Sequence, residues 1–239
     1  LLNPWLINSR KNKLWIGSEY SFLGGGYWNR ISSSTHSVLV GGEYNVISGD
    51  TPARSHRNFI GGGYQNYVVG NRASSIVGGE ENYIYSGSNF SFIGGGAQNI
   101  IYQQRSIPLS QNNTPYAIIG GGKGNYISGG TNNTIVGGLT NKIYGDSDLN
   151  RESNYGFIGG GQDNFISGDT PYGTIGGGYL NTINKDSNNG TIGGGSGNQI
   201  TASTHSSILG GITNYIWMNS NYSTIGGGTT NTLSNASVS

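Results

Sequence analysis

Three histidines are the side chains of this sequence best suited to acid–base chemistry or metal binding near neutral pH. They are His36, His56 and His205. In the repeat described below, His36 and His205 hold similar turn positions nine repeats apart, so one chain cannot bring both to a single metal ion. We therefore predict that the histidines are exposed turn residues rather than metal ligands.

The 11 acidic residues are scattered along the chain, which leaves few sets that could work together. Asp146, Asp148 and Glu152 are close in sequence and could hold a cation, although they lack the spacing and the glycine of an EF-hand loop. Glu43 and Glu80 hold the same repeat position, but not in adjacent repeats. Because glycoside-cleaving enzymes need paired carboxylates, and because the chain has no Cys nucleophile, we predict no enzymatic activity, no cofactor and no metal site.

The composition favours a repeat fold over an ordinary globular domain. Of 239 residues, 45 are Gly and 10% are charged, against about 7% and about 25% in ordinary soluble domains. Aromatic residues make up 11% of the chain, which argues against disorder. The net charge is +1, and the local group of Arg10, Lys11 and Lys13 is read as solvated surface. We therefore predict no nucleic-acid partner and, without a long apolar run, no membrane span.

One motif recurs through the chain: Ile, any residue, Gly, Gly, two variable residues, Asn, any residue, Ile. It returns with a period of about 16 or 17 positions, interrupted by three longer steps. Leu or Ile stands six residues before each Asn, and Ile, Val or Leu stands two residues after it. The repeat Asn occurs at Asn29, Asn45, Asn66, Asn82, Asn99, Asn125, Asn141, Asn164, Asn181, Asn198, Asn214 and Asn231.

A period this short can hold two short strands and two turns, but not a pair of helices. The sequence therefore predicts an all-β fold, a β-solenoid (β-roll) of about 13 coils with a 16–17-residue period, in a single domain over residues 1–239. Residues 1–20 form a degenerate first coil around Asn12, and residues 48–58, 102–117 and 144–156 form long edge loops. No polysaccharide-degrading cleft is expected in so regular a coil.

The repeat Asn is predicted to be structural. Asn suits left-handed backbone and bonds neighbouring backbone groups in turns, and identical Asn residues can bond one another along a stack. The second glycine of each motif lies inward by strand alternation or starts the turn, where only a residue without a side chain fits.

Two outward faces follow from the alternation of side chains along each strand. The first-strand face is flat, uncharged and partly apolar, and we interpret it as a subunit interface. Its candidate interface residues are Phe22, Phe59, Phe92, Ile118 and Phe157. The second-strand face is aromatic, and its side chains either pack as ladders between coils or form a platform for a glycan or receptor. These residues are Tyr67, Tyr83, Tyr126, Phe165, Tyr215 and Trp217.

The stretches Ser21–Asn29 and Thr174–Asn181 resemble the Gly-Gly-x-x-Asn repeats of YadA-like trimeric autotransporter adhesin heads. Similar repeats occur in phage and viral fibre proteins. The resemblance covers residues 6–234 and implies a β-roll, three chains side by side, exposure at a cell surface and adhesion.

These observations predict a secreted, cell-surface or virion-fibre protein with a structural or adhesive role. Its partner is expected to be itself, as a homo-oligomer (a trimer or a head-to-tail filament), and a host or surface glycan is an open alternative. Asn231 lies eight residues before the end with no visible cap, so we expect a following domain or a stacked subunit there. The chain starts at Leu1 rather than Met, which predicts processing or a fragment.

Ice binding is the other alternative, because a flat, regular Thr array suits that role. Four threonines share one column of the first-strand face, although Phe residues interrupt it. They are Thr134, Thr174, Thr191 and Thr224.

Overall fold

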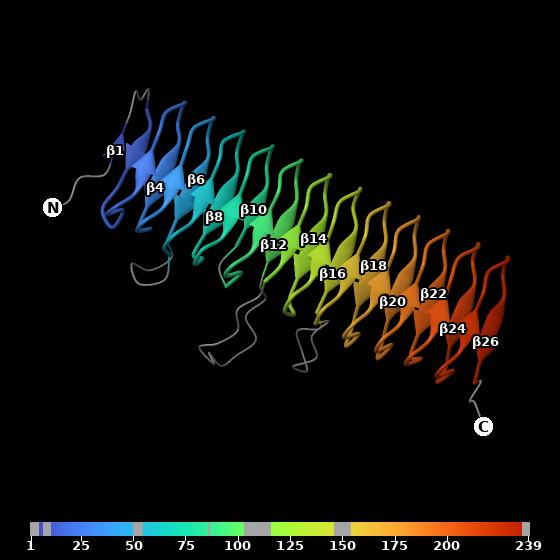
Figure 1. The fold of residues 1–239 in the computed structure, drawn as a ribbon. Coiled ribbons are helices and arrows are strands. Elements are labelled where there is room, and N and C mark those ends of the chain that lie inside the picture. Colours follow the sequence, from blue (N-terminus) through green and yellow to red (C-terminus); the bar gives the residue numbers. More distant parts are fainter. Residues whose placement is uncertain are drawn as a thin grey trace. The chain divides into compact units, whose positions relative to one another are not determined.

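The computed structural model describes residues 5–6, 11–49, 55–85, 87–102, 116–145 and 154–235. The chain divides into two compact units: unit 1 covers 1–103 and 112–124, and unit 2 covers 104–111 and 125–239. Each unit is all-β, and the described residues contain no helix. In each unit the chain winds through short, regular coils, which confirms the predicted β-solenoid (Figure 1). The prediction of a single domain over 1–239 stays a prediction.

The strands of each unit form two parallel sheets, one from the first strand of every coil and one from the second. In unit 1, the first-strand sheet contains β1 (Trp5–Leu6), β3 (Phe22–Leu23), β5 (Val38–Leu39), β7 (Phe59–Ile60), β9 (Ser75–Ile76), β11 (Phe92–Ile93) and β13 (Ile118–Ile119). The second-strand sheet contains β2 (Lys13–Leu14), β4 (Arg30–Ser32), β6 (Val46–Ser48), β8 (Tyr67–Val69), β10 (Tyr83–Ile84) and β12 (Ile100–Tyr102).

Unit 2 repeats this arrangement. Its first-strand sheet contains β15 (Thr134–Ile135), β17 (Phe157–Ile158), β19 (Thr174–Ile175), β21 (Thr191–Ile192), β23 (Ser207–Ile208) and β25 (Thr224–Ile225). Its second-strand sheet contains β14 (Tyr126–Ser128), β16 (Lys142–Tyr144), β18 (Phe165–Ser167), β20 (Thr182–Asn184), β22 (Gln199–Thr201), β24 (Tyr215–Trp217) and β26 (Thr232–Ser234).

Residues of the same motif position pair directly between neighbouring coils. Ile60 pairs with Ile76 in the first-strand sheet, and Val68 pairs with Ile84 in the second. All four side chains are fully buried. Burying one such side chain stabilises the fold by roughly 1.5 to 3 kcal/mol, so the two aliphatic columns make a continuous core within each unit.

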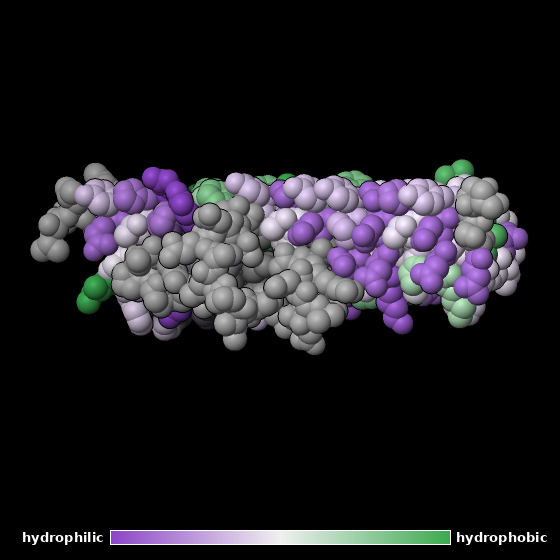
Figure 2. Space-filling model, turned by 90° about the horizontal axis from the view of Figure 1, so that it is seen from below, coloured by the Kyte–Doolittle hydropathy of each residue, from purple (hydrophilic) through white to green (hydrophobic). Residues whose placement is uncertain are grey.

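The outer surface is mostly polar but carries few charges. On the side drawn in Figure 2, pale and hydrophilic residues predominate, and strongly hydrophobic residues form only small, separate patches. No helix in the part of the chain that the structure describes is long and apolar enough to cross a membrane. Residues 50–54, 103–115 and 146–153, which form most of the predicted edge loops, lie outside the described residues.

Candidate functional site

The repeat asparagines form a buried hydrogen-bonded ladder within each unit. In unit 1, the backbone N–H of Asn82 donates to Oδ1 of Asn66 (3.1 Å), and the backbone N–H of Asn99 donates to Oδ1 of Asn82 (3.0 Å). The Nδ2 group of Asn82 donates to the carbonyl oxygens of Gly78 (3.1 Å) and Gly96 (2.9 Å). Every polar atom of this buried amide therefore has a protein partner, as buried polar groups require, and none is left for a ligand.

Unit 2 contains the same network. Asn164 donates its backbone N–H to Oδ1 of Asn141 (3.0 Å), and its Nδ2 group donates to the carbonyls of Gly160 and Gly178 (both 2.9 Å). The ladder positions of both units are fully buried except Asn231, which is exposed. The asparagines thus tie each coil to its neighbours.

The expectation that Asn occupies left-handed backbone is wrong for the ladder residues. None of them has a positive φ; the residue just before the Asn does, as at Trp28 (φ 53°), Glu81 (φ 52°) and Leu180 (φ 56°). Asn is required instead because its side chain combines one acceptor with two donors, which match one backbone N–H and two backbone carbonyls.

The second glycine of each motif starts the turn and does not point inward. Gly79 is exposed and has a φ of +93°, a region that favours glycine. A Cβ at this position would lie 2.1 Å from the carbonyl oxygen of Gly96 in the next coil. The close approach of successive coils therefore requires glycine at this position.

A second buried polar ladder lies at the opposite turn, and the sequence reasoning above missed it. The backbone N–H of Ser37 donates to Oγ of Ser21 (3.1 Å), and that of Ser74 donates to Oδ1 of Asn58 (3.0 Å). In unit 2, the backbone N–H of Ser223 donates to Oγ of Ser206 (3.3 Å). The available signal was the column two residues before the first-strand Ile, which holds only Ser, Asn, Ala and Gly.

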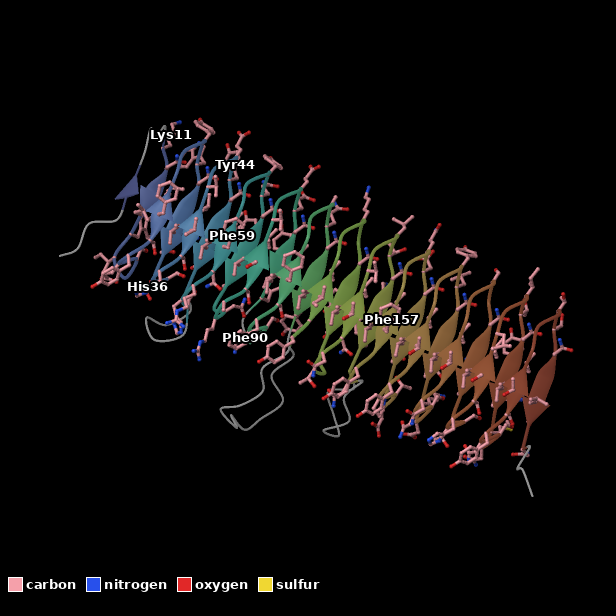
Figure 3. All side chains as sticks on the ribbon, viewed as in Figure 1. Lys11, His36, Tyr44, Phe59, Phe90 and Phe157 are labelled. Carbon is pink, nitrogen blue, oxygen red and sulfur yellow. The ribbon has the colours of Figure 1, made fainter. Side chains whose placement is uncertain are left out.

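The first-strand face of unit 1 carries phenylalanine rings that lie against glycine. A Cβ added to Gly61 would lie 3.3 Å from Cε1 of Phe59, and one added to Gly94 would lie 3.4 Å from Cε1 of Phe92. Phe59 stands between Val38 and Ser75 in the sheet, so the large rings do not meet. In Figure 3, Phe59 lies on this sheet, away from the turns.

The predicted interface residues lie on this face, as their strand positions required. Phe92 and Ile118 pair directly in unit 1 and are 39% and 41% exposed, so they offer apolar contact area. In unit 2, Phe157 is similarly exposed but is flanked by Thr134 and Thr174. The apolar character of the first-strand face is therefore strongest in unit 1.

The second-strand face carries stacked tyrosines in unit 1. The rings of Tyr67 and Tyr83 are parallel and 5.0 Å apart, and the rings of Tyr83 and Tyr85 are parallel and 5.7 Å apart. Burial, followed by the nearby Tyr67, Tyr85 and Glu81, raises the pKa of Tyr83 above its usual value near 10. These contacts match the packing interpretation of the face.

In unit 2, only some of the aromatic residues predicted for the second-strand face contact another aromatic ring. Tyr144 contacts Tyr126 (5.0 Å between ring centres) and Phe165 (5.5 Å), and burial raises the pKa of Tyr144, with a smaller effect from Tyr126. Tyr215 and Trp217 form no ring contact with an aromatic residue of the described ranges. Trp217 is 43% exposed, so its ring remains accessible.

The histidines lie at the turn edge that precedes the first strand, where sequence reasoning also missed a column of exposed aromatic rings. His36 stacks on Tyr20 (4.7 Å), and His205 stacks on Tyr222 (4.9 Å). Figure 3 places His36 and Phe90 along this edge. Burial, and then the charges of nearby Arg72, Arg57 and His36, lower the pKa of His56.

The described residues contain no group of three or more His, Cys, Asp or Glu side chains placed to hold a metal ion. Asp146, Asp148 and Glu152, the one candidate cation loop of the sequence, lie outside the described residues. The geometry therefore offers exposed surfaces for contact, and the prediction of a non-enzymatic protein stays a prediction.

The function of this chain is inferred from its sequence and its structure. No protein-family model matches this chain, and no curated protein is significantly similar to it.

Proposed function

We propose that this chain is a structural or adhesive repeat protein, secreted or displayed at a cell or virion surface, that assembles with copies of itself. The single observation that carries the proposal is the uncharged first-strand face of unit 1. It presents Phe92, Ile118 and the half-exposed Val40 and Val77 over the buried aliphatic core. Exposed apolar strips of this kind are typical of interaction surfaces.

A second copy of this chain is the occupant that the face fits best. The surface repeats once per coil, with neighbouring strands about 4.8 Å apart, and another copy has the same period. Because the face carries no charge, identical copies would not repel one another across it. The resemblance to trimeric adhesin heads favours three copies side by side.

Sedimentation velocity and electron microscopy of the purified chain test this proposal. We expect a concentration-dependent oligomer, seen as side-by-side bundles or as end-to-end fibres. A chain that stays monomeric at tens of micromolar, with no fibres on grids, would overturn it.

Ice binding is supported by a different observation, in unit 2. Thr174, Thr191, Ser207 and Thr224 pair in order across neighbouring coils, which gives four successive hydroxyl residues on one flat face. Thermal hysteresis in the purified protein, reduced by Thr191→Leu, would favour this function. Its absence would leave the structural proposal as the better one.

A further inference from the structure

A compact group of basic and aromatic side chains lies at the N-terminal coils of unit 1. We call it the basic–aromatic cluster. Its residues come from one coil and the next. They are Lys11, Lys13, Trp15, Tyr27, Trp28 and Arg30.

The cations lie over the faces of the rings. Nζ of Lys11 is 4.9 Å from the centre of the Trp28 ring, and Nζ of Lys13 is 5.6 Å from the same ring. Lys13 also lies 5.8 Å from the centre of the Trp15 ring, and Cζ of Arg30 lies 5.5 Å from it. The rings attract these cations through their π faces and so hold three positive charges close together.

These charges lack acidic partners. No ion pair joins Lys11, Lys13 or Arg30 to a carboxylate within the described ranges, and Nε of Arg30 is buried without a hydrogen-bond partner. By sequence, unit 1 holds eight of the 12 Lys and Arg residues but five of the 11 Asp and Glu residues. Unit 1 is therefore basic although the whole chain has a net charge of only +1. An anion bound at the cluster would reduce the repulsion between its three cations.

We propose that the basic–aromatic cluster binds an acidic polysaccharide, whose carboxylate or sulfate groups contact the three cations. Several cations spread over two coils fit a chain of repeated negative charges better than a single ion. Trp15 is 52% exposed, and its apolar surface can contact the C–H groups of a sugar ring beside the charges.

A single-stranded nucleic acid is less well matched to this geometry. Such strands stack their bases on open aromatic faces, whereas the Trp28 ring is already engaged by Lys11, Lys13 and the parallel Tyr44 ring. In Figure 3, Lys11 and Tyr44 lie along the same edge of unit 1. Trp15 offers one exposed ring beside three cations, whereas a single strand stacks successive bases on several rings.

This inference rests on the proposed adhesive function, to which it adds a ligand class. Binding of the full chain to four probes tests it by isothermal titration: heparin, polygalacturonate, neutral dextran and single-stranded poly-dT. We expect heparin or polygalacturonate to bind, dextran not to bind, and the affinity to fall as NaCl is raised from 50 to 300 mM. Tighter binding of heparin would identify sulfate as the preferred group, and tighter binding of polygalacturonate would identify carboxylate.

Substitutions within the cluster should separate binding from folding. Lys13→Gln and Arg30→Gln should each weaken the favoured probe about tenfold, because each removes one charge-assisted contact. Lys142→Gln is the matched control, because Lys142 is exposed and holds the same coil position as Lys13 in unit 2. Trp28→Gly should weaken binding while the fold is kept, since the corresponding positions 124 and 197 are already Gly.

Three results would overturn the inference: equal binding of dextran, tighter binding of poly-dT than of either acidic glycan, or no binding of either acidic glycan. Unchanged affinity in Lys13→Gln and Arg30→Gln would place the ligand elsewhere and overturn the assignment of this cluster. An oligomer that binds no acidic glycan would refute this inference and leave self-assembly intact, so the two proposals fail separately.

Discussion

The backbone N–H of Asn82 donates to Oδ1 of Asn66, and the side-chain Nδ2 of Asn82 lies at the same distance from this oxygen (both 3.1 Å). One amide oxygen thus faces two nitrogens of the next coil. This contact links neighbouring coils inside the turn, in addition to the backbone hydrogen bonds made there, and it makes the ladder asparagine sensitive to substitution.

Asn82→Ala should lower the free energy of unfolding by about 3 kcal/mol or more. It leaves the N–H of Asn99 and the carbonyl of Gly78 without this partner and removes one of the two donors to the carbonyl of Gly96, which keeps the N–H of Glu80. Each unpaired buried group costs roughly 1 to 3 kcal/mol. Asn82→Asp should cost more, because a carboxylate cannot donate to those carbonyls and buries a charge.

Urea denaturation followed by circular dichroism measures both changes. Asn231→Ala is the matched control, because Asn231 is exposed and its loss should cost less than about 1 kcal/mol. Equal costs at positions 82 and 231 would contradict the role assigned to the buried ladder.

Gly79→Ala should be strongly destabilising, whereas Gly78→Ala, one residue earlier, should change stability by less than about 1 kcal/mol. A Cβ at Gly79 would collide with the backbone of Gly96, but a Cβ at Gly78 meets no atom closer than 3.9 Å. Thermal melting of the two variants distinguishes them. Similar melting temperatures would show that the coils can separate to accept a methyl group.

The raised pKa of Tyr83 predicts a loss of stability at alkaline pH. Between the usual tyrosine pKa near 10 and the higher folded value, the unfolded chain loses this proton while the folded chain retains it. Stability from this group is therefore complete below about pH 10 and falls as the pH rises through the folded pKa. Urea midpoints at pH 8, 10 and 11 should decline less in Tyr83→Phe than in the wild type, and parallel declines would refute the assignment.

Phe92→Asp should abolish self-association through the first-strand face of unit 1. It places a charge where Phe92 and Ile118 form exposed apolar surface, and like charges on identical copies repel one another. Thr224→Asp is the control, since Thr224 is an exposed residue of the same coil position in unit 2. Sedimentation velocity should show smaller particles for Phe92→Asp alone; an unchanged distribution would exclude this face.

The coil and its core followed from the sequence because aliphatic residues such as Ile76 and Ile84 recur at fixed offsets from Asn82. The direction of the ladder hydrogen bonds did not follow, because it depends on backbone carbonyls such as that of Gly96, which no residue pattern reveals. The left-handed position before each Asn was missed because bulky residues such as Leu180 occupy it despite its steric cost.

The contacts of the basic–aromatic cluster were also not predicted from the sequence. The sequence predicts solvated surface for Lys11 and Lys13 because the ring that they contact, Trp28, lies one coil further along the chain. The coil period places Lys11 next to Trp28 and Lys13 next to Arg30, each one coil further along the chain. That signal was present, but the first coil lacks the Gly pair that marks the period elsewhere.

Within each unit the asparagine ladder has a direction: a coil donates an N–H to the amide of the coil before it and offers its own amide oxygen to the coil after it. Neighbouring coils are therefore interchangeable at their junctions. Recombination that adds or removes one complete coil would restore every one of these hydrogen bonds at the new junction. A chain longer or shorter by one whole coil would consequently keep its ladder continuous.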